Sequence, residues 1–337
     1  MEILLRKDFY NYVYYWLLSV LFLVGFIVVV GGLTRLTDSG LSITTWDVVS
    51  GILPPFTTED WDIAFNLYKE IPQFYLINSD ITLSEFKVIY YWEYFHRILG
   101  RILGILFLIP LFYFYYKRVF TKEYNYKLFA LFILILIQGA VGWYMVQSGL
   151  VDNVTVSHYR LATHLNLALI LFTATFWYLL NLKNLENKKF FNFSSEYNYI
   201  KVFIVLVFLQ ITFGAFTSGL DAGMIYQTWP LMNETYFPDD FVFTNSIINL
   251  LNQESFVQFI HRNLAYVITF YTIFLLIYVL YKKLSHLYNA IFFLVLIISI
   301  QVFLGILTLI SGVNIVFASM HQLSTIFLII FTINFYY

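Results

Sequence analysis

The chain has 337 residues, of which 60% are hydrophobic and 12% are charged, and its formal net charge is -1. This composition excludes an ordinary soluble domain, and we expect no nucleic-acid partner. The sequence contains no cysteine, which excludes disulfides, cysteine-ligated metals and iron–sulfur clusters. Histidine, carboxylate and tyrosine side chains must therefore carry any chemistry.

Eight apolar segments are long enough to cross a lipid bilayer, which takes roughly 20 residues in a helix. They lie at approximately 13–33, 93–116, 128–147, 160–180, 200–218, 258–280, 288–310 and 314–335. The N-terminal MEILLRKDFY has neither a small-residue cleavage site nor an Arg/Ser-rich presequence, so we expect the first helix to be a retained anchor. The sequence predicts an all-α polytopic membrane protein whose longest connections are 34–90 and 219–257.

Basic residues are distributed unequally between the two ends of these helices. Twelve lysines and arginines lie on the side of the N-terminus and seven on the other side, and the 219–257 connection has none. Because Lys and Arg accumulate on the inner side of a membrane, we place both termini in the cytoplasm or matrix. Both long connections then face outward.

Two segments that follow membrane helices repeat one pattern. Residues 31–46 read GGLTRLTDSGLSITTW and residues 214–229 read GAFTSGLDAGMIYQTW. Identities at a constant offset of 183 include Gly31/Gly214, Thr34/Thr217, Asp38/Asp221, Gly40/Gly223 and Trp46/Trp229. An internal repeat of this kind indicates a duplicated structural unit.

The later helices continue the repeat. FHRILGRIL at 95–103 parallels IHRNLAYVI at 260–268, QGAVGWYMVQSG at 138–149 parallels QVFLGILTLISG at 301–312, and ATHLNLAL at 162–169 parallels SMHQLSTI at 319–326. We therefore predict two four-helix halves fused in parallel orientation, residues 1–190 and 197–337. Because four-helix bundles build cofactor sites between facing helices, each half should hold one site.

Each half has a histidine near the start of its second helix and another near the start of its fourth. These are His96 and His164 in the first half, and His261 and His321 in the second. The two helices of each pair run in the same direction, so all four imidazoles should lie at similar depth in the outer part of the membrane. Neutral imidazole is a good iron ligand, and a facing pair is how b-type haem is held. The alternative is a histidine hydrogen-bonded between helices, although ionisable residues inside membranes are usually functional.

Small residues near His96 have two interpretations. Gly100 and Gly104 follow it by four and eight positions, on the same helix face, while Ala265 occupies the Gly100 position of the second half. They leave room for a flat macrocycle, or they pack two helices closely.

Three arginines also lie inside helix starts, namely Arg97, Arg101 and Arg262. They are candidate partners of haem propionates, or they extend to the membrane interface. His158 has no counterpart in the second half and is expected to be interfacial, and His286 is expected to be solvated.

One position breaks the symmetry of the halves. Glu93 precedes His96 by three residues, and its counterpart is Gln258. A carboxylate near a reacting carbon takes part in proton transfer or stabilises a cationic intermediate; alternatively, it is solvated or orients the histidine. Thr82 and Glu85 form a T-x-x-E capping box, so the second helix should start near 83. Glu93 would then lie near the outer surface, where water reaches it.

These residues resemble the heme A synthase family in its mitochondrial and alphaproteobacterial form. The resemblance covers nearly the whole chain, through GGLTRLTDSGLSITTW with GILPP, NSDITLSEFKVIYYWEYFHRILGR, HYRLATHLNLAL, SGLDAGMIYQTWP, IHRNLAY and MHQ. It implies oxidation of the C8 methyl of haem O to the formyl group of haem A, by successive hydroxylations and loss of water from the gem-diol. It also implies a bacterial inner membrane or a mitochondrial inner membrane as the location.

The resemblance assigns roles to matching positions. His261 and His321 become axial ligands of a haem b cofactor, whereas His96 and His164 hold the substrate haem O, and Glu93 is the acid required for turnover. It further implies a ferredoxin-type electron donor and, as a partner, the farnesyltransferase that makes haem O (haem O synthase). The sequence does not decide whether the chain forms a homo-oligomer. Many bacterial relatives carry a cysteine pair in the outer loops, and this chain has none. A mechanism that needs a thiol at that surface is therefore excluded.

Two other classes compete with this interpretation. A non-catalytic dihaem electron-transfer protein would also pair histidines. Here, however, both haems would lie on one side of the bilayer, which argues against electron transfer across the membrane. A transporter built from parallel repeats predicts duplication, yet it does not predict paired histidines near one surface. An optical spectrum and the identity of the extracted haems separate the three classes.

The charge distribution makes the topology testable. Single cysteines introduced into 34–90 or 219–257, in a chain that has none, should react with membrane-impermeant thiol reagents from the periplasm or intermembrane space. Cysteines introduced into 117–127 serve as the control and should react only after the membrane is opened. Labelling of both long connections from the inside alone would invert the topology.

Overall fold

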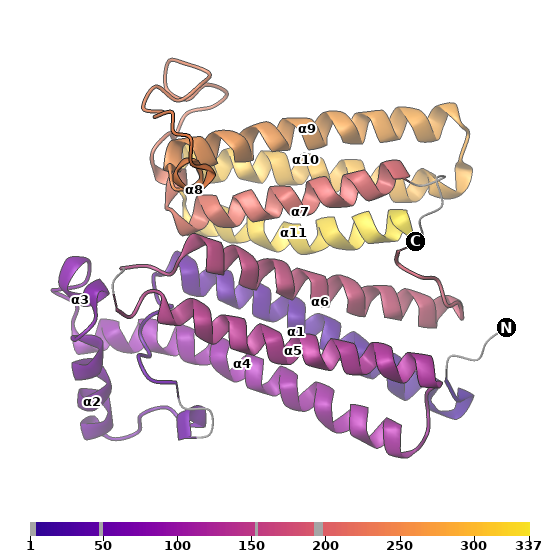
Figure 1. The fold of residues 1–337 in the computed structure, drawn as a ribbon, viewed down its shortest axis with the longest axis horizontal. Coiled ribbons are helices and arrows are strands. Elements are labelled where there is room, and N and C mark those ends of the chain that lie inside the picture. Colours follow the sequence, from indigo (N-terminus) through magenta and orange to yellow (C-terminus); the bar gives the residue numbers. More distant parts are fainter. Residues whose placement is uncertain (1–4, 47–49, 152–153, 192–197) are drawn as a thin grey trace. The chain divides into compact units, whose positions relative to one another are not determined.

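The computed structural model describes residues 5–46, 50–151, 154–191 and 198–337. This part of the chain is helical and has no β-strand beyond two isolated bridges. Its eight membrane-length helical segments confirm the predicted all-α membrane fold. They are built on α1 (Tyr10–Leu36), α4 (Leu83–Tyr116), α5 (Lys122–Gln147), α6 (His158–Asn184), α7 (Asn198–Gly219), α9 (Glu254–Tyr281), α10 (Tyr288–Ile310) and α11 (Ile315–Tyr336) (Figure 1).

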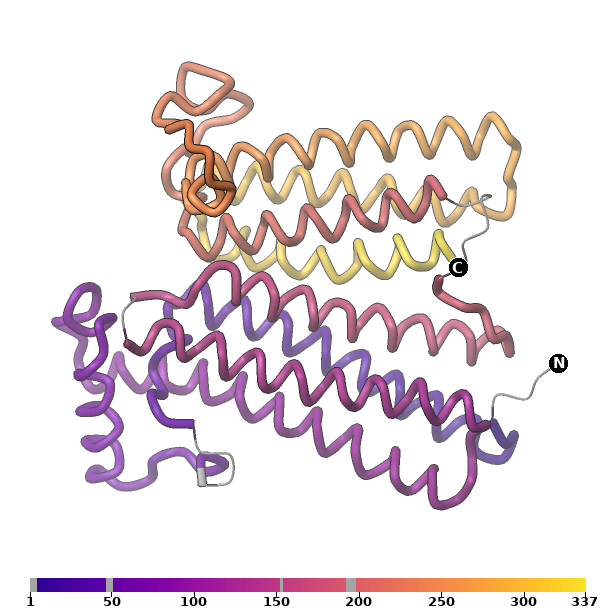
Figure 2. Tube along the Cα trace, in the orientation of Figure 1, coloured from indigo at the N-terminus to yellow at the C-terminus, as the bar shows by residue number. Residues whose placement is uncertain are grey.

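The chain divides into two compact units, Met1–Lys188 and Lys189–Tyr337. In the first unit, α1 and α5 each pack against both α4 and α6, so α4 and α6 occupy opposite corners of a bundle. In the second, α7 and α10 each pack against both α9 and α11. The Cα trace in Figure 2 shows the four long helices of each unit lying alongside one another. The histidine-bearing helices are thus the diagonal pair of each bundle.

Helix α4 begins well before its apolar segment. Thr82 accepts a hydrogen bond from the backbone of Glu85, whose side chain accepts from Thr82 N, and this confirms the predicted capping box. The helix has 34 residues, which at the standard rise is about 50 Å. The hydrocarbon layer is only about 30 Å thick, so α4 extends beyond it.

A small cap covers the extended end of α4. The chain between α1 and α4 contains α2 (Thr58–Tyr68) and α3 (Pro72–Leu76), which the hydrophobic pattern did not predict as separate elements. Buried side chains of α2, α4, the end of α5 and the connecting segments form one cluster, consisting of Leu41, Trp61, Tyr68, Ile71, Phe86, Tyr90, Val146 and Val156. The cap is therefore a packed layer and not an open loop.

Hydrogen bonds connect the cap to the end of α1. Tyr68 Oη donates to Gln73 Oε1 at 3.1 Å and accepts from Asn78 Nδ2 at 2.7 Å. Gln73 Nε2 donates to the carbonyl of Asp38 at 3.1 Å. Burial raises the pKa of Tyr68, which keeps the phenol protonated as a donor.

The connection in the second unit contains η4 (Ala222–Met224) and the short α8 (Ile247–Leu251). Tyr226 Oη donates to Asp239 and, at 2.8 Å, to Asp240. Burial and these two carboxylates raise the pKa of Tyr226. The tyrosine thus joins two distant parts of this connection.

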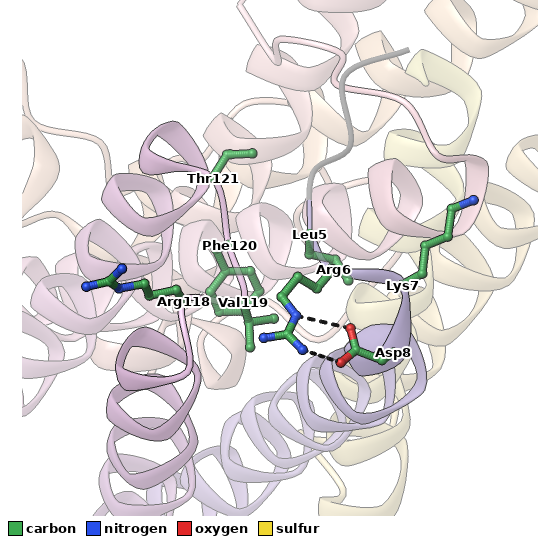
Figure 3. Close-up of a pocket in the computed structure, with 8 residues that line it drawn as sticks. All are labelled: Leu5, Arg6, Lys7, Asp8, Arg118, Val119, Phe120 and Thr121. Atoms are coloured by element: carbon green, nitrogen blue, oxygen red, sulfur yellow. Dashed lines mark hydrogen bonds and ion pairs between the residues drawn. The ribbon is translucent and has the colours of Figure 1, made fainter.

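The N-terminal segment is attached to the opposite end of the first unit. Arg6 N donates to the Val119 carbonyl at 3.0 Å, and the Arg6 guanidinium pairs with Asp8 (Figure 3). A pocket of about 390 Å³ lies there, between this segment and the α4–α5 turn. None of the predicted site residues lines it.

Candidate functional site

The two histidines of the first unit face each other across the bundle. His96 on α4 and His164 on α6 have ring centroids 6.5 Å apart and ring planes at 69°. Gln138 Nε2 lies 3.2 Å from His164 Nδ1 and donates to the His164 carbonyl at 2.9 Å. His96 Nδ1 is buried and has no hydrogen-bond partner among the described residues. The unit therefore brings this predicted pair together.

Each ring of this pair lies against a glycine on the neighbouring helix. A Cβ added to Gly31 on α1 would lie 2.9 Å from His96 Cε1, and one added to Gly142 on α5 would lie 2.9 Å from His164 Cε1. Contacts this short are not tolerated between real atoms, so any side chain at either glycine would displace the ring.

The second unit has the same contacts. A Cβ on Gly214 of α7 would lie 3.0 Å from His261 Cε1, and one on Gly305 of α10 would lie 3.2 Å from His321 Cε1. The Nδ1 atoms of both rings are buried without a hydrogen-bond partner in the described part of the chain. Each of the four paired histidines thus lies beside a glycine of a neighbouring helix.

The sequence interpretation selected different glycines. Beside Gly100 and Gly104, no atom outside their own helix backbone lies within 4 Å of an added Cβ, so the structure shows no close helix packing through them. The glycines that do lie beside the histidines could nevertheless have been found from the internal repeat. Gly31 and Gly142 match Gly214 and Gly305 at offsets of 183 and 163.

Glu93 is buried, with 3% of its surface exposed, so the expectation that water reaches it was wrong. The segment after α1 folds back over α4 and supplies two hydrogen bonds to Oε2, one from Ser42 Oγ and one from Ile43 N, both at 2.8 Å. Oε1 accepts from Arg97 Nε at 3.0 Å and from Arg97 Nη2 at 2.6 Å. The protein thus supplies four hydrogen-bond donors to this carboxylate.

Arg97 also binds the backbone of the same segment. Its Nη1 donates to the Thr45 carbonyl at 2.9 Å and its Nη2 to the Ile43 carbonyl at 2.8 Å. Its guanidinium carbon lies 4.7 Å from the ring centroid of Trp46, within cation–π range. This role in holding a loop was not among the two interpretations of the sequence.

Arg262 binds the backbone of the corresponding loop in the second unit. It donates to the carbonyls of Thr228 at 2.9 Å, Leu231 at 3.2 Å and Tyr226 at 2.7 Å. The neighbouring Gln258, 2% exposed, donates from Nε2 to the Tyr226 carbonyl at 3.0 Å. Its Oε1 is buried without a partner among the described residues.

Arg101 lies one turn beyond Arg97 on α4. Both arginines line a cavity of about 270 Å³, together with Tyr90, Tyr94 and residues of the 43–60 segment. The remaining histidines lie elsewhere. His158 is buried at the first residue of α6 with its ring 4.0 Å from that of Tyr159, and His286 is exposed.

The donor set fits haem iron better than a bare metal ion. The described residues contain no group of three or more His, Cys, Asp or Glu side chains that could enclose an ion. Haem supplies four nitrogens itself and needs only axial ligands from the protein. An imidazole nitrogen lies about 2 Å from a coordinated metal, so two rings on opposite sides of one iron have centroids roughly 6 Å apart. The 6.5 Å separation of His96 and His164 agrees with this geometry.

Fold and site together define a polytopic membrane protein with a histidine pair in each of two helical bundles. Residues 14–333 match the family model described as cytochrome oxidase assembly protein. The chain is 47% identical over 323 residues to the heme A synthase of Pelagibacter ubique, covering 94% of each chain. It is 40% identical over 320 residues to that of Rickettsia bellii, covering 93% of this chain and 94% of the relative. The chain therefore belongs to the heme A synthase family.

The glycine contacts predict a specific sensitivity to one methyl group. Gly142→Ala places a carbon 2.9 Å from His164 Cε1, whereas Gly139→Ala, one turn earlier on α5, meets no neighbour within 4 Å. Overpacking of this kind costs about 1–3 kcal/mol, so we expect haem bound by the first unit to fall several-fold in Gly142→Ala alone. Haem per chain, with the extracted haems identified by chromatography, measures the effect. Equal haem content in the two variants would contradict the assignment.

Proposed function

We propose that the chain oxidises the C8 methyl of haem O to the formyl group of haem A. Two successive hydroxylations of the same carbon, each of which removes two electrons from it and adds one oxygen atom from an external oxidant, give a gem-diol, which loses water to leave the aldehyde. The observation that best supports this proposal is the combination of one histidine pair in each bundle with a buried carboxylate beside only one of them. The names of the relatives support the same reaction.

The second unit is proposed to hold the resident cofactor, haem b. His261 and His321 lie on the diagonal helices α9 and α11, and each ring is seated on a glycine. When bound, haem b supplies one-electron transfer. The contribution of the protein is to provide two neutral imidazoles, to fix the direction in which they point, and to surround them with apolar helices that exclude water.

The first unit is proposed to hold the substrate. His96 and His164 would bind the iron of haem O and orient it, and Gly31 and Gly142 leave each ring room that any larger residue would fill. Glu93 places a carboxylate one helical turn from His96, buried and ion-paired with Arg97 at 2.6 Å. In buried surroundings the dipole of a fixed ion pair acts more strongly than in water, so its carboxylate end would stabilise positive charge that develops at the reacting carbon.

An electron-transfer role alone is less well supported. A dihaem protein that only passes electrons does not require the carboxylate of one site to be replaced by an amide in the other. Glu93 and Gln258 occupy matching positions and contact their loops with opposite polarity. This difference favours two sites with different tasks.

Location and partners complete the proposal. We place the protein in a bacterial inner membrane, with both termini in the cytoplasm; a mitochondrial inner membrane is the alternative. A ferredoxin-type protein would deliver electrons, and haem O synthase would deliver the substrate. The curated relatives from bacteria and the inner-side excess of Lys and Arg support this placement.

The haem b assignment predicts the effect of removing either ligand. His261→Ala and His321→Ala should each abolish the low-spin haem b spectrum in protein that still inserts into the membrane. His286→Ala removes an exposed histidine of the same unit and should leave the spectrum unchanged. Optical spectra of the purified proteins measure the result. Retention of the full haem b spectrum in both ligand variants would remove the assignment.

The proposed role of Glu93 predicts a separation of cofactor binding from turnover. Glu93→Gln should keep haem b and lose conversion of haem O by about 100-fold, because the carboxylate that stabilises charge at the reacting carbon is replaced by a neutral amide. Glu85→Gln, the same change at an exposed capping residue of α4, should convert haem O normally. Chromatography of extracted haems should show haem O accumulating only in the first variant. Normal haem A production by Glu93→Gln would exclude the role.

A further inference from the structure

We propose that Ser42 is a positioning residue for haem O oxidation, because its hydroxyl holds the Glu93 carboxylate and fixes the outer segment 42–46 over α4. This inference rests on the proposed function for its catalytic consequence. Ser42, Ile43, Glu93 and Arg97 are called the clasp below. No role for Ser42 follows from the sequence, in which it is one hydroxyl in a polar loop.

The first argument is that the clasp satisfies the carboxylate completely. A carboxylate has four in-plane acceptor positions, and Glu93 uses them for Ser42 Oγ, Ile43 N and two nitrogens of Arg97. The exposed fraction is 3% for Glu93 and 2% for Ser42. In this arrangement no acceptor position is directed at a ligand. Glu93 therefore acts through its charge and through the segment it holds.

The second argument comes from what the two units share. Arg97 donates to the carbonyls of Ile43 and Thr45, and Arg262 donates to those of Tyr226 and Thr228. Both pairs of carbonyls match at the offset of 183. Holding the loop by an arginine is thus common to both units and belongs to the fold.

The third argument comes from what the units do not share. The counterpart of Glu93 is Gln258, and the counterpart of Ser42, again at an offset of 183, is Ile225. The carboxylate and the hydroxyl that binds it are therefore present together in the first unit and absent together from the second. Since the loop of the second unit is held without them, we infer that the pair serves the site in the first unit.

The geometry explains how one hydroxyl has this effect. Ser42 Oγ lies 2.8 Å from Glu93 Oε2 and 3.2 Å from the Ile89 carbonyl, so it bridges the segment to two successive turns of α4. His96 is on the next turn of the same helix. Without the hydroxyl, Oε2 keeps only the backbone donor of Ile43, and the carboxylate gains freedom to rotate away from the segment.

A labelling experiment tests the clasp without using haem chemistry. Thr44→Cys introduces the only thiol of the chain, at a half-buried position of the segment. In the holoprotein, adding Ser42→Ala should increase its rate of reaction with an impermeant maleimide about tenfold, because a hydrogen bond to a charged group is lost. Ser39→Ala is the matched control. Ser39 is fully buried three residues earlier but hydrogen-bonds Thr37, so the rate should not change.

A kinetic experiment tests positioning. Ser42→Ala should lower kcat for haem O about tenfold while the haem b content and KM remain unchanged, whereas Ser39→Ala should leave all three unchanged. If Ser42 acts through Glu93, the double variant Ser42→Ala/Glu93→Gln should be no slower than Glu93→Gln alone. Additive losses in the double variant, or a normal kcat in Ser42→Ala, would overturn the inference. If the unmodified protein produced no haem A, the proposed function would fail, while the labelling rates would still decide whether the clasp exists.

Discussion

The space that a glycine leaves beside an imidazole on the next helix is the constraint on which each bundle depends. A side chain at any of the four glycines, two in each unit, would meet the ring at 2.9 to 3.2 Å, which is closer than packed atoms approach. The four glycines therefore let each histidine lie against its neighbouring helix. The Nδ1 atoms of His96, His261 and His321 are buried without a hydrogen-bond partner among the described residues, and ionisable groups of this kind inside a membrane usually serve a function.

The membrane helices and the histidine pairs could be predicted because their signals are local. Hydrophobic length identifies a spanning helix, and a repeated histidine at a fixed place in two helices identifies a pair. The burial of Glu93 could not be predicted in this way. It depends on the 42–46 segment, which has no periodic pattern and folds back over α4 through single hydrogen bonds from Ser42 and Ile43. The role of Arg97 could not be predicted either. Its acceptors in this segment are backbone carbonyls, which every residue type has, so no sequence pattern marks them.

The two units show how similar scaffolds can support different chemistry. Gln258 and Glu93 have nearly the same shape, but an amide nitrogen donates where a carboxylate oxygen only accepts. At one position the side chain binds the carbonyl of Tyr226, and at the other it binds the backbone N–H of Ile43. Exchange of one carboxylate oxygen for an amide nitrogen thus reverses the polarity of the contact, and it gives the loop-holding arginine a carboxylate neighbour in the first unit only.

Helix α4 is held at two places along its length, and this double attachment limits how far the helix can bend at the site. One part of the helix is held within the bundle by α1 and α5, and the part that extends past the hydrocarbon layer is held by Trp61, Tyr68 and the other aromatic rings of the cap. A helix that is packed at both ends bends less in its middle than a helix that is packed at one end only. His96 and Glu93 lie between these two packed regions. The cap can therefore stiffen the site without contacting a ligand, and loosening its packing would broaden the positions that the histidine samples.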